Sequence, residues 1–202
     1  MNAELINNLM ATQNTPNYLN KLKIKKNERK ATKKKILNCQ VEIKSEETIK
    51  FYEIFGELGK GAYGIVRMGI DRRTGEKVAI KVYEKKRLDE VNKIKNLERE
   101  INILNQLENP IIAKLIETIE TSTEIYLILE YGGANSLYNY LLSKPEHRLA
   151  ESEAKKFLRT IAETLNYLHD RNIVHRDIKA ENILLNRYKH LKLIDFGFSL
   201  ES

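Results

Sequence analysis

The choice between fold classes rests on one glycine-rich stretch, Gly59-Lys60-Gly61-Ala62-Tyr63-Gly64-Ile65-Val66. Glycines at this GxGxxG spacing let backbone N–H groups approach phosphate oxygens. A dinucleotide-binding βαβ unit would need a helix to begin inside the motif. Here Ile65-Val66 continue as a strand toward a turn at Gly75, so we predict that the glycines lie on a β-hairpin. Taken alone, the stretch fits a flexible turn better than a ligand site.

Strand-like segments surround this motif. They are short, rich in β-branched and aromatic residues, and separated by turn residues. We predict strands at 51–59, 62–70, 76–83, 115–121 and 124–130. Because neighbouring strands joined by short turns pair in the antiparallel sense, these segments predict a five-stranded antiparallel sheet.

Helical periodicity marks two other segments. Apolar residues recur every three or four positions over 91–107, and this pattern ends before Pro110. Two short strand-like runs, 182–185 and 191–194, lie near the end of the chain. Before them, a helix predicted at 151–170 carries an apolar stripe of Phe157, Leu158, Ile161, Ala162, Leu165 and Leu168. An antiparallel sheet with separate helices predicts the α+β class.

Composition excludes several classes of protein. The chain has 202 residues, of which 42% are hydrophobic, so it is too apolar to be wholly disordered. The longest apolar run covers only 125–129, far short of the roughly 20 residues that a membrane-spanning helix needs. Residues 1–10 lack the basic start and the sustained apolar core that are typical of a secretory signal. Cys39 is the only cysteine, which excludes an internal disulfide. We therefore expect an intracellular protein, in the cytoplasm or the nucleus.

The surplus of positive charge lies almost entirely in the first 50 residues. They hold 11 Lys and Arg against 5 Asp and Glu, a net charge of +6, while the whole chain carries +7. The densest part, Lys21 to Lys35, contains nine basic residues and little apolar periodicity. One interpretation is a solvated, largely disordered arm. The other is a patch that contacts a polyanion, such as nucleic acid or acidic lipid, or serves in nuclear import.

Further motifs follow the glycine-rich stretch in a fixed order. They are Val78-Ala79-Ile80-Lys81 on the third strand, Glu100 on the first helix, His175-Arg176-Asp177-Ile178-Lys179-Ala180-Glu181-Asn182, and Asp195-Phe196-Gly197. Together they resemble the signature set of eukaryotic-type serine/threonine protein kinase domains, each motif in the expected strand, helix or loop context. The resemblance runs from about Phe51 to the end of the chain.

The resemblance implies a two-lobed α+β fold. Residues 51–131 would form a five-stranded antiparallel small lobe with one helix and the hinge, preceded by the basic arm at 1–50. Residues 132–202 would form part of a helical large lobe. Only five residues follow Asp195-Phe196-Gly197, so the family's activation segment and later helices are absent from these 202 residues. We expect an incomplete large lobe, in which apolar side chains of the 151–170 helix stay in water.

The resemblance also implies a reaction and its cofactors. Such kinases transfer the γ-phosphoryl group of Mg-ATP to a protein hydroxyl, in a site that mainly supplies positive charge and alignment. Lys81 would contact the α- and β-phosphates while paired with Glu100. Asn182 and Asp195 would hold Mg²⁺, which prefers oxygen ligands. The alternative is a catalytically incompetent chain that binds a nucleotide or a partner protein.

The catalytic loop carries two further implied roles. Asp177 would accept or orient the proton of the attacking hydroxyl, and Lys179 would neutralise the transferring phosphoryl group. A lysine two residues after the aspartate resembles the members that act on serine or threonine. His175 would be structural and would stack on Phe196.

The nucleotide site implied by the resemblance is built around a hinge. Backbone groups of Glu130-Tyr131-Gly132 would hydrogen-bond the adenine edge, and Leu129 would lie behind the base. Ser136 stands where these kinases often carry an acidic residue for the ribose, and a serine hydroxyl binds more weakly than a carboxylate. The whole set is Gly59, Gly61, Gly64, Val66, Ala79, Lys81, Leu129, Glu130, Tyr131, Gly132, Ser136 and Leu184.

Overall fold

The computed structural model describes three stretches of the chain, 36–39, 41–60 and 64–201. The chain divides into two units, Met1–Ile36 and Leu37–Ser202, and all the helices and strands described lie in the second unit. The basic segment Lys21 to Lys35 and the central glycine Gly61 lie outside the described residues. What the sequence predicts for them therefore stays a prediction.

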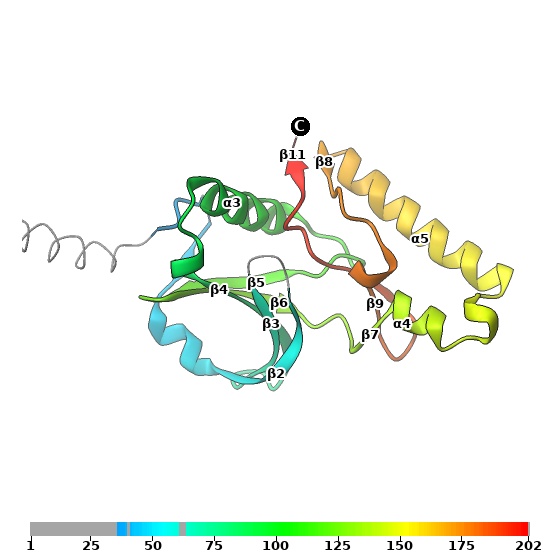
Figure 1. The fold of residues 1–202 in the computed structure, drawn as a ribbon, viewed down its shortest axis with the longest axis horizontal. Helices are drawn as coiled ribbons and strands as arrows, with labels where there is room; N and C mark the ends of the chain where they lie inside the picture. The colour runs from blue at the N-terminus through cyan, green and yellow to red at the C-terminus, as the bar shows by residue number, and fades with distance from the viewer. Residues whose placement is uncertain (1–35, 40, 61–63, 202) are drawn as a thin grey trace, which may run out of the picture. The chain divides into compact units, whose positions relative to one another are not determined.

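A six-stranded sheet forms the first part of the second unit (Figure 1), with the strand order β1-β5-β6-β4-β3-β2. The strands are β1 (Ile43–Lys44), β2 (Tyr52–Lys60), β3 (Ile65–Asp71), β4 (Lys77–Glu84), β5 (Leu115–Glu120) and β6 (Glu124–Glu130). Strands β2 to β6 match the five predicted strands, and their antiparallel pairing confirms the predicted hairpins. The core of the sheet includes the cross-strand pair Ile80 and Ile128, both completely buried.

The sixth strand, β1, was not predicted. It pairs in parallel with β5, and a 3-10 helix, η1 (Glu46–Phe51), connects it to β2. Strand β1 and most of η1 therefore lie within residues 1–50, the segment that the sequence analysis assigned to the basic arm. A two-residue strand has no periodicity to detect, and it forms here because the edge of β5 offers open backbone groups.

Helix α3 (Val91–Gln106) lies against one face of the sheet (Figure 1) and matches the predicted helix. A short 3-10 helix, η2 (Lys85–Arg87), leads into it. The buried apolar residues of α3 are Leu97, Ile101, Ile103 and Leu104, spaced as its apolar stripe predicts. Ile103 and Leu104 also belong to the core of the following helical region, so α3 packs against both parts of the fold.

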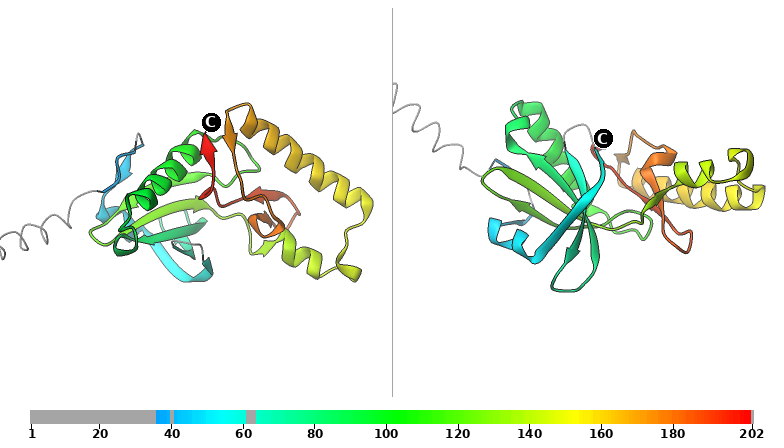
Figure 2. Two further views of the ribbon diagram at one scale, coloured as in Figure 1. Left: turned by 45° about the horizontal axis from the view of Figure 1, so that its top comes forward. Right: turned by 60° about the horizontal axis from the view of Figure 1, so that its bottom comes forward.

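The second part contains two helices and two small sheets (Figure 2). Its elements are β7 (Asn135–Ser136), α4 (Leu137–Leu142), η3 (Pro145–His147), α5 (Glu151–His169), β8 (Ile173–Val174), η4 (Ala180–Asn182), β9 (Ile183–Leu185), β10 (Leu191–Leu193) and β11 (Leu200–Glu201). The predicted helix at 151–170 and the predicted strands near 182–185 and 191–194 are confirmed. Helix α4 was missed because it has only six residues.

Helix α5 is better covered than the sequence led us to expect. Phe157 and Leu168 are buried, and Ile161 and Leu165 pack against the same core. This core also contains residues of α4, so the short unpredicted helix covers part of the apolar stripe. Leu158 alone of these large side chains is strongly exposed, at 66%. Of the large apolar side chains that we expected to stay in water, only Leu158 does so to a large extent.

In the part of the chain that the structure describes, no helix is long and apolar enough to cross a membrane.

Candidate active site

Lys81 lies on strand β4, where successive side chains point to opposite faces of the sheet. Val78 and Ile80 point into the core on one face of the sheet, so Ala79 and Lys81 point to the other. There the Lys81 ammonium lies 2.7 Å from Oε1 of Glu100, on α3. Both side chains are almost fully buried, at 9% and 3% exposure. A lysine is rarely buried without a partner, and this one has a carboxylate from a separate element.

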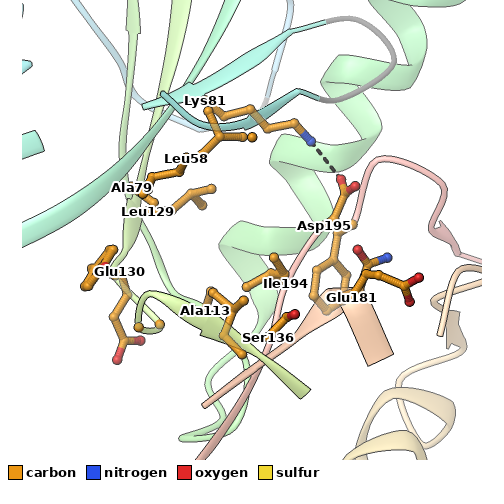
Figure 3. Close-up of a pocket in the computed structure, with 18 of the residues that line it drawn as sticks. Leu58, Ala79, Lys81, Ala113, Leu129, Glu130, Ser136, Glu181, Ile194 and Asp195 are labelled. Atoms are coloured by element: carbon orange, nitrogen blue, oxygen red, sulfur yellow. Dashed lines mark hydrogen bonds and ion pairs between the residues drawn. The ribbon is translucent and has the colours of Figure 1, made fainter. Parts of the chain in front are cut away.

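Asp195 supplies a second carboxylate to the same ammonium. Its Oδ1 atom lies 2.9 Å from Nζ of Lys81 (Figure 3). Burial by itself raises the pKa of Asp195, but the charge and hydrogen bond of Lys81 and the backbone N–H of Gly197 lower that pKa overall. Burial likewise disfavours the Lys81 ammonium, but Glu100 and Asp195 raise its pKa well above the ordinary value. Lysine and aspartate therefore both stay charged at neutral pH.

The predicted catalytic loop forms its own hydrogen-bonded group. Asn182 donates its side-chain amide to the backbone oxygen and to Oδ2 of Asp177, each at 2.8 Å. The Lys179 ammonium lies 2.8 Å from the same Oδ2 atom. The hydrogen bond from Lys179 is the main reason why the pKa of Asp177 lies below its ordinary value. Asp177 is therefore an oriented carboxylate that stays ionised near neutral pH.

His175 is the first residue of the catalytic-loop motif, and the family resemblance implies a structural role for it. It is buried, and its ring contacts that of Phe196 edge to face, with 4.7 Å between the centroids. One ring nitrogen lies 3.1 Å from the backbone oxygen of Ile194, and the other accepts the N–H of Asp177. Burial lowers the pKa of His175. The ring therefore connects the loop at Asp177 with the segment that carries Asp195.

A cavity of about 420 Å³ opens beside Lys81 and Asp195 (Figure 3). Its lining is made of the sheet on one side and of β9, η4 and the segment after β10 on the other. The predicted site residues that line it are Gly59, Val66, Ala79, Lys81, Glu100, Leu129, Glu130, Tyr131, Gly132, Ser136, Asn182, Leu184 and Asp195. Gly64, Asp177 and Lys179 are described but do not line it.

Gly64 has a packing reason to be glycine. A Cβ atom added there would lie 2.5 Å from the backbone oxygen of Val82, which no real side chain tolerates. The absence of a side chain lets β3 begin close against β4. At Gly59 an added Cβ would meet nothing within 4 Å, so that glycine leaves space beside the cavity.

Several residues of the cavity were not predicted. They include Leu58, Ala113, Asn139, Glu181 and Ile194. Leu58 lies directly before the glycine-rich stretch and Ile194 directly before Asp195, so adjacency to a motif was a usable signal for both. No local sequence pattern marks Ala113 or Asn139 as a cavity residue.

Ser136 caps a helix in addition to its predicted contact with the ribose. It is the N-cap of α4, where its Oγ atom accepts the backbone N–H of Asn139 at 3.1 Å. One acceptor site of the hydroxyl is therefore already used. The group can still donate its proton toward the cavity that it lines.

The comparison with known proteins identifies the family. The family model described as Protein kinase domain matches residues 52–202. The chain therefore belongs to the protein kinase domain family, which confirms the resemblance and the α+β class expected from the motifs.

Curated relatives agree with this assignment. Maternal embryonic leucine zipper kinase of Danio rerio is 40% identical over 154 residues, which cover 76% of this chain and 22% of that protein. Carbon catabolite-derepressing protein kinase of Saccharomyces cerevisiae is 38% identical, over 73% of this chain and 23% of that protein. Probable serine/threonine-protein kinase MARK-A of Dictyostelium discoideum is 38% identical, over 79% of this chain and 15% of that protein. The chain spans less than a quarter of the length of each of these relatives.

Proposed function

We propose that this chain carries the catalytic residues of an ATP- and Mg²⁺-dependent protein kinase that phosphorylates serine or threonine. The observation that carries the proposal is the Lys81 ammonium, held between Glu100 and Asp195 on the wall of a cavity. A cation fixed in this way suits the binding of phosphate groups, because phosphoryl transfer depends on charge stabilisation and alignment.

Asn182 and Asp195 fit a magnesium site. Asp195 is an ionised carboxylate, and Asn182 commits its amide nitrogen to Asp177, which leaves the amide oxygen as the atom that can serve as a ligand. The described residues contain no group of three or more His, Cys, Asp or Glu that could hold a metal. Mg²⁺ commonly binds through one or two protein oxygens together with phosphates and waters. When bound, the ion supplies positive charge that offsets the charge of the phosphates.

Asp177 and Lys179 are proposed to act on the acceptor. The Asp177 carboxylate is oriented by two donors and stays ionised, so it can accept a hydrogen bond from an incoming hydroxyl and take its proton. Lys179 adds positive charge beside it. The choice of serine or threonine rests on this lysine and on the name of the Dictyostelium relative, a serine/threonine-protein kinase.

The adenine base is proposed to bind along the hinge. Val66, Ala79, Leu129 and Leu184 give the cavity its apolar walls. Residues 130–132 line the same cavity, and their backbone groups are proposed to hydrogen-bond the edge of the base. Gly133 has φ of +121°, and an added Cβ would lie 2.5 Å from the backbone oxygen of Leu185. Only glycine therefore allows the chain to turn this closely past β9.

The test is transfer of γ-labelled phosphate from ATP to a mixed protein substrate, followed by phosphoamino-acid analysis. The chain extended through the family's activation segment and later helices should label serine or threonine in the presence of Mg²⁺, and Asp195→Asn should lose that labelling. These 202 residues alone should label weakly or not at all. Label on tyrosine would contradict the proposed acceptor. ATP binding without any transfer would favour the alternative, a nucleotide-binding chain that is not a catalyst.

A further inference from the structure

Tyr83 contacts the ion pair of the site from inside the protein. It lies on β4 two residues after Lys81, so both side chains emerge on the same face of the sheet. Its hydroxyl donates a hydrogen bond of 2.7 Å to Oε2 of Glu100. The other carboxylate oxygen of Glu100, Oε1, binds Lys81. Glu100 is therefore held at both oxygens by two residues of one strand.

The charges of the cluster explain why such a donor is needed. Glu100 and Asp195 bring two negative charges to the single positive charge of Lys81. An excess negative charge in a buried site is costly unless it is hydrogen-bonded. The Tyr83 hydroxyl supplies that hydrogen bond without adding a second cation, which would compete with Lys81 for Glu100.

Tyr83 is also well fixed by its surroundings. Its side chain is buried, at 3% exposure, and it shares a cavity of only about 30 Å³ with Leu88 and Leu97. Its ring lies 3.5 Å from the position that a Cβ would take at Gly64, the residue directly before β3. Burial and the nearby Glu100 carboxylate raise the pKa of Tyr83 well above its ordinary value, so the phenol keeps its proton and remains a donor.

We propose that Tyr83 is a positioning residue, which fixes the Glu100 carboxylate so that Lys81 is aimed at the phosphate groups of ATP. The nucleotide part of this inference rests on the function proposed above. Tyr83 itself does not line the large cavity. Its effect is therefore expected on phosphate binding and transfer, and not on recognition of the base.

The test uses calorimetry to measure the affinities of the 202-residue chain for two ligands, Mg-ATP and adenosine. Tyr83→Phe removes only the hydroxyl. We expect it to weaken Mg-ATP binding about tenfold, the effect of losing one hydrogen bond to a charged group. Adenosine lacks the phosphates, so its affinity should change less than about twofold. A role in packing alone would change both ligands alike.

Tyr52→Phe is the matched control. Tyr52 is also buried, and its hydroxyl also binds a glutamate, Glu117, away from the cavity. This variant should leave the affinities for both ligands unchanged. If Tyr83→Phe behaves like Tyr52→Phe, or weakens both ligands equally, the positioning role is wrong.

Thermal melting tests the contact without any nucleotide. Tyr83→Phe should lower the melting temperature on the order of 5 °C in the wild-type chain. When Glu100 is also replaced by Gln, Tyr83→Phe should lower the melting temperature by less than half as much, because a hydrogen bond to a neutral amide is weaker than one to a carboxylate. Equal shifts in the two backgrounds would overturn the inference. If the wild-type chain binds adenosine and Mg-ATP equally well, the proposed function fails, and the melting result alone decides the Tyr83–Glu100 contact.

Discussion

The ammonium nitrogen of Lys81 lies 2.7 Å from Oε1 of Glu100, across the contact between strand β4 and helix α3. The position of the helix therefore determines whether the lysine is held. Any movement of α3 away from the sheet would break this pair and leave Lys81 with Asp195 as its remaining charged contact. The arrangement of the site thus depends on packing as well as on chemistry.

Replacing Lys81 should separate phosphate binding from binding of the base. Lys81→Met keeps an apolar stem but removes the cation, so we expect Mg-ATP affinity to fall at least about tenfold while adenosine affinity is retained, as calorimetry would measure. The free energy of unfolding should also fall by about 3 kcal/mol, because the Glu100 carboxylate stays buried without the cation that balances its charge.

Lys85→Met is the matched control for this variant. Lys85 forms a similar pair of 2.8 Å with Glu120, and both side chains are largely buried. It should lower the stability in urea unfolding but leave Mg-ATP affinity unchanged. Equal effects of the two variants on Mg-ATP would contradict the role of Lys81.

The pH dependence of stability should report on His175. Burial lowers its pKa below the ordinary 6.5, so the unfolded chain takes up a proton at a higher pH than the folded chain does. The free energy of unfolding should therefore decrease as the pH falls below about 6.5. His175→Tyr keeps an aromatic ring beside Phe196 but does not titrate there, so it should flatten this part of the curve. If the slope survives in His175→Tyr, titration of His175 is not its cause.

Arg73 should matter for stability and not for nucleotide binding. Its guanidinium donates to Asp71, to Glu117 at 2.8 Å and to the Tyr52 hydroxyl at 2.6 Å. Lysine cannot reproduce this fork, so Arg73→Lys should lower the free energy of unfolding by about 1 to 3 kcal/mol in urea denaturation. Arg72→Lys, at an exposed neighbour 3.7 Å from Glu53, should change it by less than about 0.5 kcal/mol. The cluster has no stabilising role if the two variants behave alike.

Two adjacent residues of α5 test how its apolar stripe is covered. Phe157 is buried in the core, and its ring contacts that of Tyr140. Phe157→Ala should cost about 3 to 5 kcal/mol of unfolding free energy. Leu158→Ala should cost less than about 0.5 kcal/mol, because Leu158 is 66% exposed. Similar losses at both positions would mean that the helix packs differently from the structure described.

Local patterns were enough to predict most of the fold. Alternation in β4 and the apolar spacing of α3 each mark one element, and both elements form where the sequence places them. The family resemblance also assigned Lys81 and Asp195, 114 positions apart, to one site. It paired Lys81 with Glu100 only, so the contact between Lys81 and Asp195 was not predicted.

The features that were missed depend on tertiary contacts. Strand β1 exists because it adds to the edge of β5, and α4 exists because Ser136 caps it and the α5 core covers it. The hydrogen bond of Tyr83 was equally invisible, since a tyrosine in a strand usually indicates only core packing. Its meaning appears only once β4 and α3 are placed together.

The central claim is that Asp177 assists transfer of a phosphoryl group to a serine or threonine hydroxyl. Its most direct test is a single-turnover measurement on the chain extended through the family's activation segment and later helices. The protein is in excess over γ-labelled Mg-ATP, and the two peptides differ only in a serine or tyrosine acceptor. The account predicts label on the serine peptide and a rate at least about 100-fold lower for Asp177→Asn. Equal rates for wild type and Asp177→Asn, or label on the tyrosine peptide alone, would contradict it.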